Sequence, residues 1–127
     1  MADFIELPWP SKELSPNARC HWAVKARAVS AYRKKCYLLA KMAGMAAPSA
    51  GKLMLQIEFV PPTRRGVDDD NALAAFKAGR DGLADALRID DRRFVTQISV
   101  SETPIKGGLV RCRVLAADGG GINGGGQ

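Results

Sequence analysis

The chain has 127 residues, a formal net charge of +6 at pH 7 and 46% hydrophobic residues, which suits one compact domain with a modest core. No stretch approaches the roughly 20 apolar residues of a membrane-spanning helix, and the N-terminus carries acids and prolines where a signal peptide has lysines and an apolar run. The three cysteines are widely spaced and lack a CxxC pattern, which argues against a disulfide framework or a zinc site and favours a reducing cytoplasm.

The first half of the chain predicts a short strand, a loop, a long helix and a second strand. Residues 4–7 suit a strand that is ended by PWPS, because proline cannot donate to a sheet ladder. Between residues 23 and 43 apolar side chains recur every three or four positions, as in an amphipathic helix, and Gly44 would end it. Apolar and polar residues then alternate in KLMLQIEFV (residues 52–60), which predicts a half-buried strand.

The second half predicts one helix and two further strands. The helix runs from about Asn71 to Leu87, with Asp70 as its N-cap. Two strands follow, FVTQISVSE and LVRCRVLA, and the proline and paired glycines of the linking TPIKGG suit a hairpin connection.

This order of elements predicts the fold class. Strand, helix, strand, helix, strand, strand indicates an α+β fold in which one small, mixed, mostly antiparallel sheet carries two helices. We expect a single domain over residues 1–117. Residues 118–127 contain six glycines and a single bulky apolar residue, which predicts a flexible tail.

The charges are unevenly distributed along the chain. Between Asp68 and Asp91, seven acids stand against Lys77, Arg80 and Arg88, a local net charge of −4. The rest of the chain has 16 bases against six acids, a net charge of +10. A basic surface attracts polyanions, nucleic acid above all. The same lysines and arginines suit equally well the plain solvation of a small protein.

The acidic segment suggests a metal site. On an extended segment alternate side chains share a face, so Asp68 and Asp70 would point the same way at a loop-to-helix junction. Two convergent carboxylates can hold Mg²⁺, which prefers oxygen ligands and commonly takes only one or two carboxylates from a protein. Asp90 and Asp91 would return to the same region if the strand after them pairs beside residues 52–60.

Lys77 has two readings that the spacing does not separate. It lies seven residues after Asp70, about two helical turns, so its ammonium group is placed to stabilise charge developing on a phosphate oxygen. It is equally placed for an ion pair with Asp81 at i,i+4. Other chemistries lack their parts, since there is one histidine, His21, and no nucleophile elbow, P-loop or dinucleotide fingerprint.

Several motifs together resemble a known family. In order along the chain, RRGVDDDN, then KAGRD, then GLADALRIDDRRF look like the central segment of the RusA family of Holliday-junction resolvases. The strong match covers about residues 61–94, and LPWPSKELSPNARCHW is similar to the family's proline-rich first strand and following loop. DxDN alone is a weak signal; DxDN, a helix and a DD pair in this order are much more specific.

The resemblance implies site residues. It places Asp68 and Asp70 at the two aspartates of DxDN and Asp91 at the third catalytic carboxylate, with Asp90 as a neighbouring metal ligand. The family lysine falls where this chain has Leu73 and Ala74, so Lys77, about three residues later, is the candidate for its role. For contacts with the DNA backbone we expect five basic residues: Arg64, Arg65, Lys25, Arg33 and Lys34.

The resemblance also implies a function and partners. The expected activity is that of a crossover junction endodeoxyribonuclease, a magnesium-dependent homodimer that resolves four-way DNA junctions by paired nicks in recombination and repair. Mn²⁺ is expected to substitute for Mg²⁺, and the expected location is the cytoplasm of a bacterial cell or phage-infected host. Two alternatives remain open: a non-catalytic basic DNA-binding module, and a protein-interaction adaptor that uses the basic helix near Arg33.

Overall fold

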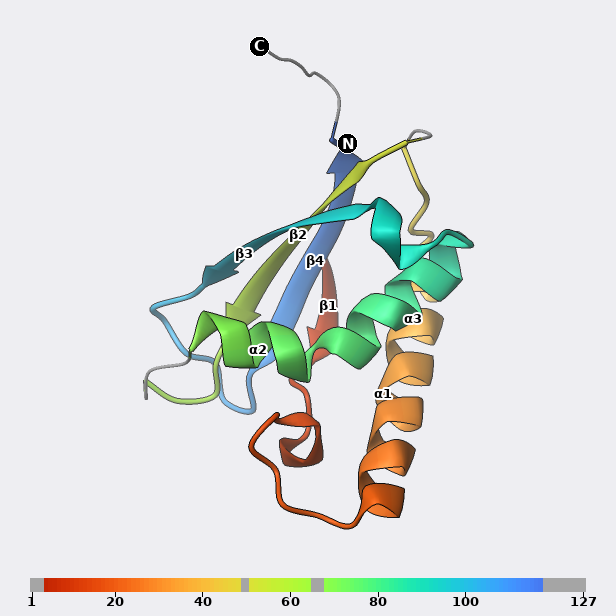
Figure 1. Cartoon of the computed structure of the whole chain (residues 1–127). Helices are drawn as coiled ribbons and strands as arrows, with labels where there is room; N and C mark the ends of the chain where they lie inside the picture. Colours follow the sequence, from red (N-terminus) through yellow and green to blue (C-terminus); the bar gives the residue numbers. More distant parts are fainter. Residues whose placement is uncertain (1–3, 49–50, 65–67, 118–127) are drawn as a thin grey trace.

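The computed structural model describes residues 4–48, 51–64 and 68–117, so the tail expected over 118–127 lies outside the described residues. The α+β class and the order of the elements agree with the prediction (Figure 1). The elements are β1 (Ile5–Pro8), η1 (Lys12–Leu14), α1 (Trp22–Met42), β2 (Leu53–Val60), α2 (Asp69–Ala75), α3 (Lys77–Leu87), η2 (Asp91–Arg93), β3 (Phe94–Val100) and β4 (Leu109–Ala116).

The four strands form one mixed sheet in the order β1-β4-β2-β3. β4 runs antiparallel to both β1 and β2, whereas β3 runs parallel to β2, with Leu53 opposite Phe94. Two antiparallel pairings and one parallel pairing confirm a mixed, mostly antiparallel sheet. The alternation predicted for β2 is also confirmed, because Leu53, Leu55, Ile57 and Phe59 are buried beneath the helices.

The predicted hairpin between the last two strands is wrong. β2 lies between β3 and β4, so the two strands joined by residues 101–108 do not pair with each other. Neighbouring strands lie about 4.8 Å apart, so a link that passes over one strand spans about 10 Å, which eight residues easily reach. The link is tied to the end of β2 by the Ile105 N–H, which donates to the Pro61 carbonyl over 3.1 Å.

The second predicted helix is in fact two helices, so the sheet carries three helices rather than two. The break is at Phe76, where φ is −88° and ψ is 0°. Its N–H points at the carbonyls of both Ala72 and Leu73, and its ring packs edge-on against Phe59 and Tyr32. Gly79 leaves room for that ring, since a Cβ there would lie 2.5 Å from it. The break between α2 and α3 therefore coincides with the burial of the Phe76 ring.

Helices α1 and α3 pack at very close range. Gly82 allows this approach, because a Cβ at this position would lie 2.3 Å from the backbone oxygen of Arg33. At the other end of α1, Gly44 adopts a φ of +72° directly after the helix, as its predicted role as terminator requires. None of the described helices is long and apolar enough to cross a membrane.

Candidate functional site

The acidic loop differs in conformation from the sequence prediction. Asp68, not Asp70, is the N-cap of α2: its Oδ1 accepts from the N–H of Asp70 at 2.8 Å and of Asn71 at 3.3 Å. Asp69 and Asp70 are the first residues of the helix, so the triplet is not one extended segment. The Asp70 side chain is exposed and makes no hydrogen bond or ion pair with any described residue.

The second acidic group is organised around Asp91, at the start of η2. Arg80 of α3 donates from Nη1 to Asp91 Oδ2 over 3.0 Å and from Nη2 to the Asp91 carbonyl over 3.1 Å. The arginine is itself held, because its Nε lies 3.3 Å from Thr96 Oγ1 and its Cζ lies over the Phe94 ring. Asp91 therefore has a fixed position with one third of its side chain exposed.

Lys77 forms the ion pair that its spacing allows, and its role toward a phosphate stays a prediction. Its Nζ is 3.0 and 3.1 Å from the two carboxylate oxygens of Asp81, the i,i+4 pair. The same Nζ is 3.9 Å from Asp91 Oδ2, so it also reaches the second aspartate of the DD pair. At 63% exposure the Lys77 side chain remains accessible to a ligand.

Asp90 lies beside Asp91 and is paired with Arg92, its neighbour in the chain. It caps η2 by accepting from the Arg92 N–H, and it forms an ion pair with the Arg92 guanidinium at 3.0 Å. These hydrogen bonds from Arg92 lower the pKa of Asp90 to about 2. The carboxylate is thus ionised at neutral pH, as a metal ligand must be.

A cavity of about 240 Å³ opens beside these residues. Its lining combines four carboxylates with one guanidinium and two apolar side chains: Asp81, Asp85, Asp90, Asp91, Arg33, Ala84 and Ile89. Sequence reasoning missed Asp81 and Asp85 as wall residues and Arg80 as the partner of Asp91. The spacing did contain a signal, because residues 77, 80, 81 and 84 follow the i,i+3,i+4,i+7 rule for one helical face.

The acidic loop around Asp68 and the acidic group around Asp91 lie near opposite ends of β2 and are bridged by helices α2 and α3. Because β3 is parallel to β2, Asp91 lies near the start of β2, whereas Asp68 follows the end of β2. Helices α2 and α3 run back between these two ends, and Lys77 lies about 10 Å along them from Asp70. Over the residues that the structure describes, no three His, Cys, Asp or Glu side chains are gathered closely enough to hold one metal ion.

The basic residues expected on DNA fall into different environments. Arg64 and Lys34 are exposed and have no hydrogen-bonding or ionic partner among the described residues, and Lys25 is partly exposed. Arg33 is engaged, because its guanidinium donates to both oxygens of Asp85 at 2.7 and 2.9 Å. This contact raises the pKa of Arg33 and lowers that of Asp85. Arg65 lies outside the described residues.

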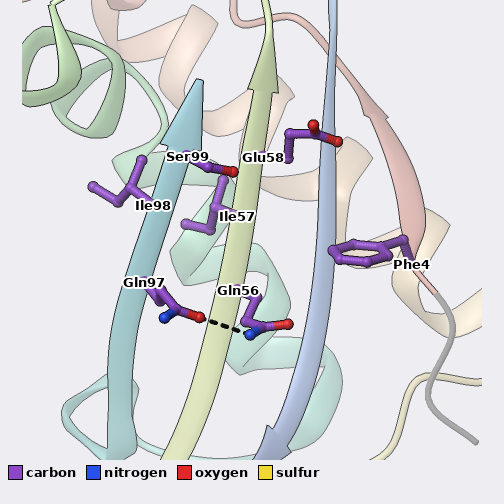
Figure 2. A pocket seen from close by; sticks show the side chains of 7 residues that line it. All are labelled: Phe4, Gln56, Ile57, Glu58, Gln97, Ile98 and Ser99. Atoms are coloured by element: carbon purple, nitrogen blue, oxygen red, sulfur yellow. Dashed lines mark hydrogen bonds between the residues drawn. The ribbon is translucent and has the colours of Figure 1, made fainter. Parts of the chain in front are cut away.

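The face of the sheet opposite the helices carries a shallow hollow of about 440 Å³. Figure 2 shows its lining residues: Phe4, Gln56, Ile57, Glu58, Gln97, Ile98 and Ser99. Gln56 of β2 donates to Gln97 of β3 across the hollow over 2.6 Å. Beside it, Arg111 donates to both Glu58 and Glu6. Arg113 on the same face donates to Gln56, so this helix-free face carries both basic and acidic groups, whereas four carboxylates line the acidic cavity.

Comparison with known proteins gives a relative but no function. No family model matches the chain. A curated protein of Xylella fastidiosa (strain Temecula1 / ATCC 700964), described as an uncharacterized protein, is 55% identical over 95 residues, which are 72% of this chain. The chain spans about 62% of the length of that relative. Because the relative has no functional name, the function has to be argued from the site.

Proposed function

We propose that the chain is a magnesium-dependent, structure-selective endonuclease of the RusA type that resolves four-way DNA junctions by paired nicks. The observation that carries the proposal is the grouping of Lys77 and Arg80, in the middle of the helical segment that begins at Asp69, with Asp91 of η2. The three residues come from two segments that are separated in sequence, and each bears a charge suited to phosphoryl transfer.

The donor type suits a hard divalent cation, and binding one ion with all three carboxylates would require Asp68 and Asp70 to approach Asp91, because they are not gathered among the described residues. Asp70 offers an exposed carboxylate without a described partner, and Asp91 offers one whose position Arg80 fixes. Asp68 uses Oδ1 in its cap and has a second oxygen. We assign Asp68, Asp70 and Asp91 as ligands of Mg²⁺ or Mn²⁺, with Asp90 as their neighbour. When bound, such an ion supplies Lewis-acid activation of water and neutralises charge on the phosphate.

The protein's own residues bind and orient the substrate in this proposal. The exposed Lys77 ammonium stabilises negative charge that develops on a nonbridging phosphate oxygen. Arg80 acts on Asp91 and not on the substrate, because its side chain is only 19% exposed and its donors are directed at Asp91 and Thr96. Arg64 and Lys34, which are exposed, attract the sugar-phosphate backbone.

We also propose a homodimer, since two opposed nicks in a twofold-symmetric junction require two sites. The surface that we assign to it is the helix-free face of the sheet. There Arg111 is paired with both Glu6 and Glu58, in contrast to the basic character of the chain as a whole. Phe4 at 41% and Val95 at 43% exposure add apolar area that a second copy would bury.

The decisive experiment replaces one carboxylate oxygen ligand. Asp70→Asn should abolish nicking of a synthetic four-way junction with Mg²⁺, while junction binding stays intact or becomes tighter because a negative charge is removed. Asp69→Asn is the matched control, since Asp69 is the exposed neighbour in the same first turn and lies outside the DxDN positions. Undiminished nicking by Asp70→Asn would refute the assignment.

The two alternative functions give different results in the same assay. A non-catalytic DNA-binding module would shift junction DNA in a gel but would yield no cut product with either Mg²⁺ or Mn²⁺. A protein-interaction adaptor would bind junction and duplex DNA equally weakly and would bind a protein partner saturably. The acidic cavity next to Lys77 favours the nuclease, because neither alternative requires it.

A further inference from the structure

A third cavity, of about 180 Å³, lies between the segment after β1 and the buried side of α2. Its walls are mainly apolar and include Trp9, Phe59, Ala72 and Ala75. The volume equals about six water molecules at roughly 30 Å³ each, which is room for one planar heterocycle and too little for a base pair. The nuclease chemistry proposed above does not use this cavity.

The aromatic wall is held in place by its surroundings. Phe59 meets the Trp9 ring edge-on, with the ring centroids 6.2 Å apart and the planes at 83°. Gly108 lies against another part of the ring, since a Cβ at that position would be 3.1 Å from Trp9. The residue before Trp9 is anchored as well, because the Tyr32 hydroxyl donates to the Pro8 carbonyl over 2.6 Å. The indole is therefore a preorganised platform for a planar ligand.

The rim of the cavity is polar and basic. The exposed Lys12 contributes a cation, and Asn71 contributes an amide that can both donate and accept a hydrogen bond. Asn71 directly follows Asp70 in the first turn of α2, so the cavity adjoins the proposed metal ligands. An aromatic wall, an amide and a cation at the mouth match the ring face, the polar edge and the phosphate of one nucleotide.

We infer that this cavity receives a single unstacked nucleobase of the DNA strand next to the cut phosphate. The inference rests on the proposed function and gives it a source of structure selectivity. Base pairs in an intact duplex are stacked and paired, and extruding a base costs a few kcal/mol, least where stacking is already disturbed, as at a branch point. A site that stacks an extruded base on Trp9 therefore favours branched DNA over duplex DNA.

The tryptophan itself reports on the cavity. The only other tryptophan, Trp22, is 76% exposed at the start of α1, so Trp22→Phe leaves Trp9 as the only tryptophan, which can be excited selectively over the two tyrosines. In EDTA, which prevents cutting, we expect four-way junction DNA to quench Trp9 fluorescence. The same junction with abasic nucleotides at the branch point should bind with markedly less quenching. Equal quenching by the two junctions would overturn the inference without any variant of the cavity.

A filling variant tests the cavity independently. Ala75→Leu places a larger side chain at a cavity wall on α2 while keeping a good helix former. We expect it to weaken junction binding about tenfold, because stacking contributes about 1–3 kcal/mol per base, and to abolish the quenching. The matched control is Ala74→Leu, since Ala74 is the exposed neighbour and does not line the cavity. Circular dichroism spectra of both variants should match the parent spectrum, which checks that they are folded.

The results separate this inference from the proposed function. If Ala75→Leu binds the junction as the parent does and retains the quenching, the inference is wrong. If the parent protein nicks junctions but shows no base-dependent quenching, the proposed nuclease function is supported and the proposed base pocket is wrong. If the parent binds no DNA at all, both fall together.

Discussion

Arg80 fixes Asp91 at two points, with one guanidinium nitrogen on the carboxylate and another on the main-chain carbonyl. The pair joins the middle of the helical segment to the beginning of β3. Arg80 also lies over the ring of Phe94, the first residue of the strand, with its Cζ 5.5 Å from the ring centroid. The orientation of the proposed third ligand thus depends on a residue outside the DxDN and DD motifs.

Arg80→Gln should weaken metal-dependent nicking. Loss of the guanidinium leaves Asp91 free to rotate, and losing a partner that orients a metal ligand typically costs about 10- to 100-fold in metal affinity or activity. We expect the Mg²⁺ concentration for half-maximal nicking to rise accordingly, with activity partly restored at high Mg²⁺. Arg88→Gln is the control, since Arg88 is exposed just after α3. An unchanged Mg²⁺ dependence in Arg80→Gln would contradict the role given to Arg80.

Lys77→Met should reduce the rate of nicking more than it reduces binding. An ammonium that acts on developing charge contributes mainly in the transition state, and losing one such donor costs about 10²- to 10³-fold in rate. Its exposed ion pair with Asp81 contributes less than about 1 kcal/mol to stability, so the fold should persist. The measurements are single-turnover nicking and the urea unfolding midpoint.

Lys34→Met is the matched control for Lys77. Lys34 is exposed on α1, and no partner for it exists among the described residues. If it contacts a phosphate, its loss lowers binding and the salt dependence of binding without changing the rate of the bound complex. Equal single-turnover rates in Lys77→Met and Lys34→Met would remove the special role of Lys77.

Local patterns predicted the elements well because each element is specified by its own residues. The alternation in β2 gave the buried face, and the position of Gly44 gave the end of α1. The break at Phe76 is not predicted by the local pattern, and it coincides with a tertiary contact: the ring packs against Phe59 and Tyr32, which lie on other elements. The helical propensities of residues 71–87 depend only on the local sequence, so they contain no information about that contact.

Strand pairing and the environment of Asp91 were harder to infer. The segment between β3 and β4 contains a proline and two glycines, which suit a hairpin. The same residues suit a crossing over the end of β2 equally well. The sequence does not indicate that β2 lies between the two strands. The sequence indicates Asp91 as a site residue only through its position in the DD pair. Arg80, eleven residues earlier, becomes its partner only because β3 returns parallel to β2 and places η2 against α3.

Gly82→Ala should destabilise the fold although alanine is the better helix former. The new methyl group would lie 2.3 Å from the Arg33 carbonyl oxygen, so α1 and α3 would have to separate. Overpacking of this kind costs about 1–3 kcal/mol, more than the roughly 1 kcal/mol gained in propensity. The free energy of unfolding from urea titration measures the balance, with Ser30→Ala on the exposed side of α1 as the control. A more stable Gly82→Ala protein would show that the helices can separate at little cost.

The three cysteines should differ sharply in reactivity. Burial raises the pKa of the Cys36 thiol to about 12 and that of Cys112 well above its ordinary value, while Cys20 is exposed. A raised pKa keeps a thiol protonated at pH 8, and only the thiolate attacks a disulfide reagent. Ellman's reagent should therefore titrate one fast thiol per folded chain and all three in urea. Loss of the fast reaction in Cys20→Ser identifies that thiol, and rapid reaction of all three in the native protein would contradict the burial.

Val95→Glu should dissociate the proposed homodimer. Val95 is 43% exposed on the helix-free face of β3, and a twofold interface repeats each substitution, so two carboxylates would be introduced into one buried surface. We expect the molar mass from light scattering to fall from two chains to one, while the circular dichroism spectrum stays unchanged. Ala26→Glu, an exposed substitution on α1, is the control and should leave the mass at two chains. A dimer that survives Val95→Glu would show that the interface lies elsewhere. If the Val95→Glu protein is monomeric, it should still bind a junction but make single, unpaired nicks.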